Sequence, residues 1–377
     1  MSTLKELLKK YCPDGVEYKT LEDVCIIYTG EQLNRKNMIK EGYPVINGGI
    51  QASGYTNNFN EYEETITISQ GGASAGFVNF MLEKFWAGAH CYIIKPNTDK
   101  LINKYLFFVL KNIEIHIMEL KNGAGIPGIN KNKITKIKIP LLPIEVQKEI
   151  VRILDTFTKY QDLLNRELEL RKKQYEYYRD KLLTFSNDKA QWKRLGDIAH
   201  IVMGQSPDSK SYNNKNIGLP FLQGCASFGT IYPLINTYSS DIKKIAVNGS
   251  ILMSVRAPVG KLNIANTDIC IGRGLCSINS NCEVSNKYVF YSLKNIIKYI
   301  ADKSKGAIFD SITSDSIRNI KIPVPPLEEQ ERIVNILDKF DALCNDITRG
   351  LPAEIKLRKK QYEYYRDKLL TFKEKKK

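Results

Sequence analysis

The longest regular pattern of apolar and polar positions lies in the middle of the chain. Between Ile150 and Phe185, apolar side chains recur at alternating steps of four and three residues, with polar interruptions at Gln161 and Arg171. This heptad spacing predicts a long helix whose apolar stripe packs against another helix. At 1.5 Å per residue, the helix would be about 54 Å long.

A second stripe of the same kind begins at Ile333 and continues through Leu337 and Phe340. It then meets Gly350 and Pro352. Glycine often ends helices and proline cannot continue one, so we expect a break here and two helices that together lie along the first. The two stripes are expected to pack on each other as an antiparallel intramolecular pair.

Both stripes belong to an internal duplication. The sixteen residues LRKKQYEYYRDKLLTF occur at 170–185 and again, without one difference, at 357–372. Upstream, IKIPLLPIEVQKEIVRILDTF (137–157) resembles IKIPVPPLEEQERIVNILDKF (320–340) at an offset of 183 residues. Such a repeat indicates two copies of one structural unit.

The repeat divides the chain into globular and helical segments that alternate. The globular segments are expected at 1–143 and 187–326, the helical spacers at 144–186 and 327–373, and a basic tail at 374–377. Similarity between the globular segments fades to scattered anchors, whereas the helical segments are partly identical. The globular segments are therefore expected to share a scaffold and to differ in their loops.

The globular segments show the mixed pattern of α/β structure. Apolar runs bounded by glycine or proline predict strands within TITISQGG (65–72), HCYIIKP (90–96), ITKIKIP (134–140) and GSILMSV (249–255). Longer amphipathic runs predict helices over 103–120 and 286–304. The expected fold class is α+β, with two globular mixed α/β domains separated by a long antiparallel, coiled-coil-like helical pair and related by a pseudo-two-fold duplication.

Charge is distributed unevenly along the chain. The net charge is +15, which favours a polyanionic partner such as nucleic acid over a charge excess that serves solubility alone. Residues 186–326 hold 17 basic against 9 acidic side chains, whereas residues 144–185 hold 9 against 8. The basic surface is thus expected on the globular segments, chiefly the second, and not on the helices.

The sequence contains no pattern that we would assign to catalysis or to a metal site. The eight cysteines form no CxxC pair and the three histidines are scattered, so zinc binding is not predicted. The run GGASAG (71–76) has the spacing of a phosphate loop, but Phe77 stands where that loop needs Gly-Lys-Ser/Thr. No apolar run is long enough for a membrane helix, so we expect a cytoplasmic protein without a membrane partner.

The layout and two motifs resemble the specificity subunit of type I restriction–modification enzymes. The motifs are IPVPPLEEQERIVNILDKF (322–340) and the duplicated RKKQYEYYRDKLLTF, and the resemblance covers the whole chain. It implies two target-recognition domains on double-stranded DNA, and spacers that dock two modification (adenine-N6 methyltransferase) subunits, joined by restriction subunits. It also implies a non-catalytic chain without a cofactor of its own, because the partners would use S-adenosylmethionine, ATP and magnesium.

On this hypothesis, each domain reads one half of an asymmetric bipartite target and the helices set the spacing. Two identical partners need two identical docking surfaces, which would account for the identical sixteen-residue copies. Recent duplication or gene conversion would also produce the identity without any docking role. The residues expected to face the partners lie beside the apolar stripes: Gln174, Glu176, Tyr177, Arg179, Asp180, Gln361, Glu363, Tyr364, Arg366 and Asp367.

DNA contacts are expected in polar and basic loops between the strands. The candidates are Asn47, Gln51, Tyr55, Gln70, Ser74 and His90 in the first domain, and Gln205, Ser206, Lys210, Gln223, Arg256, Lys261 and Arg273 in the second. The two arginines rank first, because bidentate pairing of arginine with guanine is the commonest specific contact. Two other functions stay open: an orphan nucleic-acid-binding adaptor without a restriction partner, and a structural coiled-coil scaffold.

Overall fold

Two compact units make up the chain in the computed structural model, which describes residues 2–123, 127–186, 190–303, 312–346 and 348–375. Unit 1 combines residues 1–163 with 357–377, and unit 2 comprises residues 164–356. Helix α6 (Ile144–Leu182) contributes its first half to unit 1 and its second half to unit 2. Each unit therefore contains one globular domain and parts of both helical spacers.

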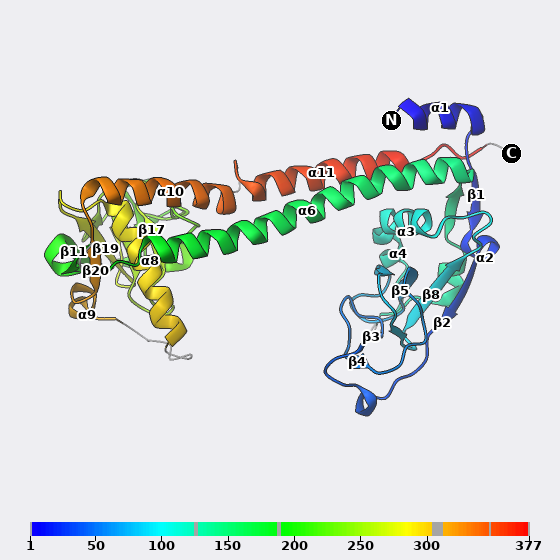
Figure 1. Cartoon of the computed structure of the whole chain (residues 1–377), viewed down its shortest axis with the longest axis horizontal. Helices are drawn as coiled ribbons and strands as arrows, with labels where there is room; N and C mark the ends of the chain where they lie inside the picture. Colours follow the sequence, from blue (N-terminus) through cyan, green and yellow to red (C-terminus); the bar gives the residue numbers. More distant parts are fainter. Residues whose placement is uncertain (1, 124–126, 187–189, 304–311, 347, 376–377) are drawn as a thin grey trace. The chain divides into compact units, whose positions relative to one another are not determined.

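Unit 1 is built on three small sheets (Figure 1). The strands are β1 (Glu17–Thr20) with β9 (Lys138–Leu141); β2 (Cys25–Thr29), β8 (Cys91–Pro96), β5 (Thr65–Ser69) and β6 (Val78–Met81); and β4 (Tyr55–Thr56), β3 (Tyr43–Ile46) and β7 (Trp86–Ala87). The helices are α1 (Ser2–Tyr11), α2 (Leu21–Val24), α3 (Asn103–Asn112), α4 (Glu114–Glu119) and α5 (Lys131–Thr135). Helix α3 packs against β6 and β8 and covers the four-stranded sheet.

Unit 2 repeats this arrangement. Its sheets are β10 (Gln191–Arg194) with β20 (Lys321–Val324); β11 (Ala199–Met203), β19 (Leu275–Ser280), β16 (Ile251–Ser254) and β17 (Leu262–Ile264); and β12 (Tyr212–Asn213), β14 (Tyr238–Ser239), β13 (Leu219–Leu222), β18 (Ile269–Ile271) and β15 (Ile245–Ala246). The helices are α7 (Leu195–Ile198), α8 (Asn286–Lys303), α9 (Ser314–Arg318), α10 (Leu327–Asn345) and α11 (Leu351–Leu370), the last of which lies mainly in unit 1. The short turns η1 (Arg35–Asn37), η2 (Ser209–Ser211) and η3 (Cys225–Ser227) complete the two domains.

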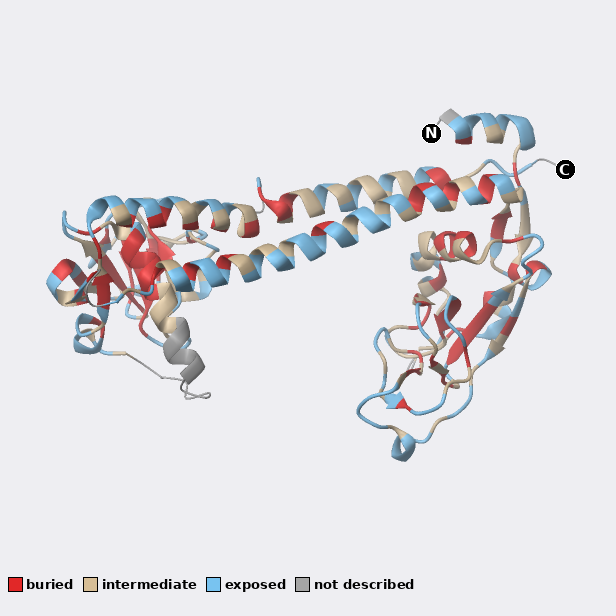
Figure 2. Ribbon diagram, viewed as in Figure 1, coloured by how far each residue is buried: buried red, intermediate tan, exposed pale blue. Residues whose placement is uncertain are grey.

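The order of the strands confirms the duplication and the mixed α/β fold class. The order β2-β8-β5-β6 in unit 1 corresponds to β11-β19-β16-β17 in unit 2, and the parallel pair β3–β7 corresponds to β13–β18. The central strands β5 and β16 are buried along their whole length, as expected for runs rich in isoleucine, threonine and methionine between covered faces (Figure 2).

Two elements differ from the sequence-based expectation. The segment 134–140 is not one strand, because its first two residues end helix α5 and the strand β9 begins only at Lys138. The helix expected over 103–120 is interrupted at Ile113, which separates α3 from α4. A short apolar run does not distinguish a strand from a buried helical turn, which explains the first error.

Within each unit, one identical sixteen-residue copy packs on the first half of the other spacer. In unit 1, Phe157 of α6 stacks on Tyr365 of α11, with 5.5 Å between ring centroids. In unit 2, Phe340 of α10 stacks on Tyr178 of α6 at 5.8 Å, and Tyr175 lies beside it at 6.2 Å. The helices run antiparallel within each unit, and their apolar stripes are joined to the domain cores.

The break between α10 and α11 falls where the sequence predicts it. A Cβ on Gly350 would lie 2.4 Å from the carbonyl oxygen of Ala342 and 2.6 Å from that of Leu343. Only a residue without a side chain fits between these two carbonyls. Among the residues that the structure describes, no helix is long and apolar enough to span a membrane.

Candidate nucleic-acid interface

In unit 2, the two leading arginines flank the edge where β16 ends and β19 begins. The Val255 N–H donates to the carbonyl oxygen of Gly274 (2.9 Å), which extends the antiparallel pairing of the strands by one residue. Arg256 follows this end of β16 and Arg273 precedes this start of β19, so both arginines lie at the same end of the sheet. Both side chains are exposed, and neither forms a hydrogen bond or ion pair within the described parts of the chain. Two guanidinium groups at one strand edge suit an anionic ligand with planar acceptor groups.

A serine and a glutamine lie next to Arg273. The Ser206 hydroxyl donates to Gln223 Oε1 (2.9 Å), and the Ser206 Oγ accepts the backbone N–H of Arg273 (3.2 Å). The Gln205 N–H donates to the carbonyl oxygen of Ile271 (3.0 Å). The structure thus brings together four candidates that lie as far apart in the sequence as 205 and 273.

Lys261 joins the group from the hairpin between β16 and β17. Its N–H donates to Ser254 Oγ (2.8 Å), and the same hydroxyl donates to the carbonyl oxygen of Pro258 (2.6 Å). This serine closes the loop that carries Arg256. Arg256 and Lys261 are therefore held at the two sides of one short hairpin, on the same edge as Arg273.

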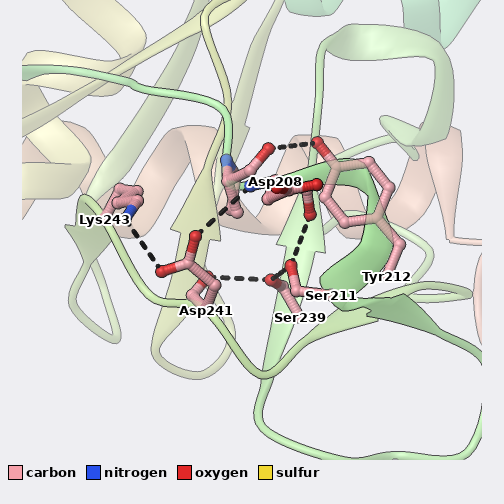
Figure 3. Close-up of polar contacts among 7 residues, drawn as sticks. Asp208, Ser211, Tyr212, Ser239, Asp241 and Lys243 are labelled. Carbon is pink, nitrogen blue, oxygen red and sulfur yellow. Dashed lines mark hydrogen bonds and ion pairs between the residues drawn. The ribbon is translucent and has the colours of Figure 1, made fainter.

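Lys210 lies on a loop that is fixed by a chain of polar contacts (Figure 3). Its N–H donates to Asp208 Oδ1 (3.0 Å), while the Asp208 N–H donates to Asp241 Oδ2 (3.3 Å). Asp241 Oδ1 pairs with Lys243 (3.1 Å), and the ion pair, followed by the Asp208 N–H, lowers the pKa of the Asp241 carboxyl. Hydroxyls of Ser211 and Ser239 bond across the loop at 2.8 Å.

These loop-fixing residues had no signal in the sequence. Asp208 belongs to no motif of the sequence, and Ser239 and Asp241 lie about thirty residues from the loop that they hold. Asp208 in fact caps the η2 turn by accepting an N–H from within it. Short polar side chains that bond to nearby backbone groups stabilise such turns.

In unit 1, the equivalent edge lies between the end of β5 and the start of β8. The Gln70 N–H donates to the carbonyl oxygen of His90 (3.0 Å), and the His90 N–H donates to Asn47 Oδ1 (3.3 Å). The Ser74 hydroxyl donates to the carbonyl oxygen of Gly48 (2.7 Å), which also accepts the Ser69 hydroxyl. Asn47, Gln70, Ser74 and His90 are therefore neighbours, at the edge that carries the arginines in unit 2.

Two candidates of unit 1 are not joined to this cluster by any contact among the described residues. Gln51 is exposed in the loop after β3, and Tyr55 is exposed on β4, which pairs with the other side of β3. Next to β4 lies an aromatic group that sequence reasoning missed. Phe59 contacts Tyr62 with 5.4 Å between centroids, and the Lys84 ammonium lies 4.6 Å from the Phe59 ring.

Two glycines, each two residues before β6 or β17, serve the fold. Gly76 and Gly260 both have positive φ angles, of 91° and 83°. A Cβ on Gly76 would lie 2.8 Å from the backbone of Met118, and one on Gly260 would lie 2.8 Å from the Ile297 side chain. Their small size is thus required by α4 and α8 of this chain, through contacts that the sequence did not reveal.

The residues expected to face a partner are only partly on the surface. Tyr177 and Tyr364 are each 60% exposed, and a lysine ammonium lies over each ring at 5.7 Å and 5.6 Å. Asp180 and Asp367 are also exposed, and Glu176 is exposed with an interaction of its own. An equivalent tyrosine face is thus present on both units.

The surface position expected for Arg179 is wrong. Its residue is only 4% exposed, because the guanidinium bonds to Asp180 (2.5 Å) and lies 5.8 Å from the Tyr175 ring. The equivalent Arg366 is half-buried and donates to Asn112 Oδ1 (2.8 Å). Both arginines are therefore engaged in internal contacts of this chain.

The glutamines of the two copies are half-buried and held by their own helices. Arg171 donates to Gln174 Oε1 (2.9 Å), and Arg358 donates to Gln361 Oε1 (3.0 Å). Glu363 is half-buried as well. Among the described residues, no group of three or more histidine, cysteine or acidic side chains could hold a metal ion.

The comparison with protein families decides which class of domain carries these two edges. The model described as "Type I restriction modification DNA specificity domain" matches residues 13–171 and again residues 187–357. The chain belongs to this family. Its two units each carry one specificity domain, which agrees with the resemblance seen in the sequence motifs.

Relatives of the specificity family match over most of the chain. One from Methanocaldococcus jannaschii, whose name assigns it to the specificity subunits of type I restriction enzymes, is 38% identical over 73% of this chain and 69% of its own length. A type I restriction enzyme specificity subunit from Escherichia coli is 33% identical over 73% of this chain and 72% of that protein. The crystal structure of a type I system S subunit from M. genitalium covers 94% of this chain and 96% of that one, with a TM-score of 0.62 and 19% identity.

Family membership settles the class of function. Specificity subunits of type I restriction–modification systems are non-catalytic DNA-recognition subunits, and this chain is one of them. Membership also implies, as partner classes, DNA and the methyltransferase and restriction subunits of such a system. The stand-alone scaffold considered from the sequence is not supported.

Proposed function

We propose that the two specificity domains read the two different halves of one asymmetric bipartite DNA target. The observation that carries this proposal is the shared edge. Both domains place polar candidates where β5 meets β8 or where β16 meets β19, yet the residues there differ. Arg256 and Arg273 occupy the second domain, whereas Gln70 and His90 occupy the first. A common scaffold that carries different base-contacting residues is expected where the two half-sites differ in sequence.

The proposed contacts also differ in chemistry between the domains. The second domain offers two arginines and Lys261, which favour guanine edges and phosphates. The first offers the amides of Asn47 and Gln70, which favour adenine edges. Because residues 186–326 carry 17 basic against 9 acidic side chains, we expect this domain to supply the larger share of the salt-dependent affinity.

The duplicated helix faces support a second part of the proposal. Tyr177 and Tyr364 occupy the same position in the two copies and are both exposed, with an exposed aspartate three residues further on. We propose that these equivalent faces dock two copies of a modification subunit, an adenine-N6 methyltransferase, and that restriction subunits join through that complex. Aromatic side chains on an exposed helix face are common anchors at protein interfaces.

Cofactor chemistry would reside entirely in the partners. On this proposal the chain binds neither S-adenosylmethionine nor ATP nor magnesium. Equilibrium dialysis of the purified chain against each ligand should give no saturable binding, whereas the complex with the modification subunits should bind S-adenosylmethionine. Saturable binding to the isolated chain would contradict this assignment.

The decisive experiment maps methylated adenines across a genome by long-read sequencing, with and without the gene for this chain. We expect one bipartite motif with a fixed gap to lose its methylation when the gene is removed. An unchanged methylome would instead favour an orphan DNA-binding adaptor. Co-purification then distinguishes the two functions, because only the specificity subunit should retain a methyltransferase.

A further inference from the structure

Each unit contains a fully buried glutamine in the first turn of its spacer helix. Gln147 is the fourth residue of α6 and Gln330 the fourth residue of α10, and both are 0% exposed. The two positions correspond in the repeat. Burying an amide is unfavourable unless its oxygen and nitrogen are both paired. A glutamine at both positions therefore requires specific partners.

In unit 1, three hydrogen bonds tie the Gln147 amide to the backbone of the specificity domain. Its Oε1 accepts the Ile102 N–H (2.8 Å), which lies at the start of α3. Its Nε2 donates to the carbonyl oxygens of Lys100 (2.9 Å) and Leu142 (2.6 Å). One side chain thus connects the spacer helix to the loop before α3 and to the end of β9.

Unit 2 contains the same three bonds. Gln330 Oε1 accepts the Ser285 N–H (2.9 Å), and Nε2 donates to the carbonyl oxygens of Glu283 (3.3 Å) and Pro325 (2.8 Å). All three partner positions have changed residue type between the units, but the bonds go to backbone atoms. The connection has therefore been kept while the surrounding side chains diverged.

A second contact joins helix and domain further along each spacer. Lys104 of α3 pairs with Asp155 of α6 at 2.9 Å, and Lys287 of α8 pairs with Asp338 of α10 at 2.5 Å. Each aspartate follows its glutamine by eight residues, or about 12 Å along the helix. Within the apolar packing of helix and domain, two polar contacts separated along one helix constrain both the position and the angle of the domain more than one contact does.

We propose that Gln147 and Gln330 are positioning residues that hold each specificity domain at a set angle on its spacer, and thereby fix the gap at which the half-sites are read. This inference rests on the proposed bipartite readout. One base pair displaces a half-site by 3.4 Å along the duplex. Without the glutamine, the domain keeps the lysine–aspartate pair and its apolar packing on the helix but loses three directional bonds next to the start of the helix. Loss of the glutamine should therefore relax the gap and not the half-site sequence.

The test measures methylation by the complex of the full chain with its modification subunits. The substrates are duplexes that carry the mapped half-sites with the native gap, or with a gap one base pair shorter or longer. For Gln147→Leu, we expect the ratio of rates on native and altered gaps to fall about tenfold, equivalent to about 1.4 kcal/mol. Arg152→Gln is the matched control, because Arg152 is exposed on the same helix and its ion pair among the described residues is with Glu149 of that helix.

A second, milder variant distinguishes a change in domain position from misfolding of Gln147→Leu. Asp155→Asn removes the lysine pair at a partly exposed site and should lower the same ratio less. An equal loss of rate at every gap in Gln147→Leu, with the ratio unchanged in both variants, would mean that the glutamine serves stability alone and would overturn the inference. A wild-type complex that modifies these duplexes without any gap preference would overturn the proposed bipartite readout itself.

Discussion

Replacement of Arg256 is the sharpest test of the proposed interface. Its side chain is exposed at the β16–β19 edge and has no hydrogen bond or ion pair within the described residues, so Arg256→Ala removes no internal contact that the structure records. The free energy of unfolding should therefore change by no more than about 0.5 kcal/mol. A bidentate arginine–guanine contact contributes about 1–3 kcal/mol of discrimination, which corresponds to about 5- to 150-fold in affinity.

The assay is a binding titration of the complex with duplexes that vary one half-site at a time. Discrimination should weaken at one position of the second domain's half-site, and the first domain's half-site should be read as before. Arg256→Lys should also relax readout, because lysine keeps the charge but lacks the planar fork. Lys321→Ala is the control, since it removes one charge from β20, on a different sheet of the same domain.

Two results would refute this reasoning. If the recognised motif is unchanged in Arg256→Ala, the residue is not a reader. If affinity falls equally for all sequences and the slope of log affinity against log salt decreases by about one, Arg256 contacts a phosphate instead of a base. A measured loss of several kcal/mol in stability would show that the side chain has an internal role, against its exposed position.

Three further predictions follow from contacts described above. Leu337→Ala should lower the free energy of unfolding of unit 2 by about 3 kcal/mol in a denaturant titration, because the side chain is 0% exposed; a loss under about 1 kcal/mol would contradict close packing there. Asp241→Ala should weaken binding to cognate DNA, because it releases the loop that carries Lys210. Asp241→Asn keeps an acceptor for the Asp208 N–H and should bind more tightly than the alanine variant. Equal affinities of the two variants would exclude a role of Asp241 in fixing this loop. Tyr177→Ala or Tyr364→Ala should each reduce the number of methyltransferase subunits in the purified complex from two towards one, and the double variant should retain none. Native mass spectrometry measures this number, and two subunits in the double variant would exclude these tyrosines from docking.

The regular features of the sequence predicted the helical part of the structure well. The heptad stripe through Leu154 and Leu164 identified α6, because a repeating apolar face can only be buried by another element. Gly350 and Pro352 identified the break between α10 and α11 for a local steric reason. Within each domain, the strands with long apolar runs were also found.

The remaining features depend on contacts between residues far apart in the sequence. Gln223 meets Arg273 through Ser206 only because β13 pairs with β18, a pairing that composition does not encode. Arg179 was assigned to the surface because heptad spacing gives the position of a residue around the helix but not the direction of a long side chain. A long guanidinium on a flexible stem can turn into the helix interface, where it lies beside the buried Tyr175 ring.

The division of unit 1 into two sequence stretches has a consequence for synthesis on the ribosome. The Tyr18 hydroxyl bonds to the carbonyl oxygen of Phe372, and Val16 pairs with Glu374, across more than 350 residues. At about 5–20 residues per second, the partners of this segment emerge roughly 20–70 seconds after it does. Residues 164–356, by contrast, contain all of unit 2. The domain of unit 2 can therefore fold before synthesis ends, whereas part of the core of unit 1 stays exposed until residues 357–377 emerge. A chain truncated near its C-terminal end is expected to lose recognition by the domain of unit 1 and to keep recognition by the domain of unit 2.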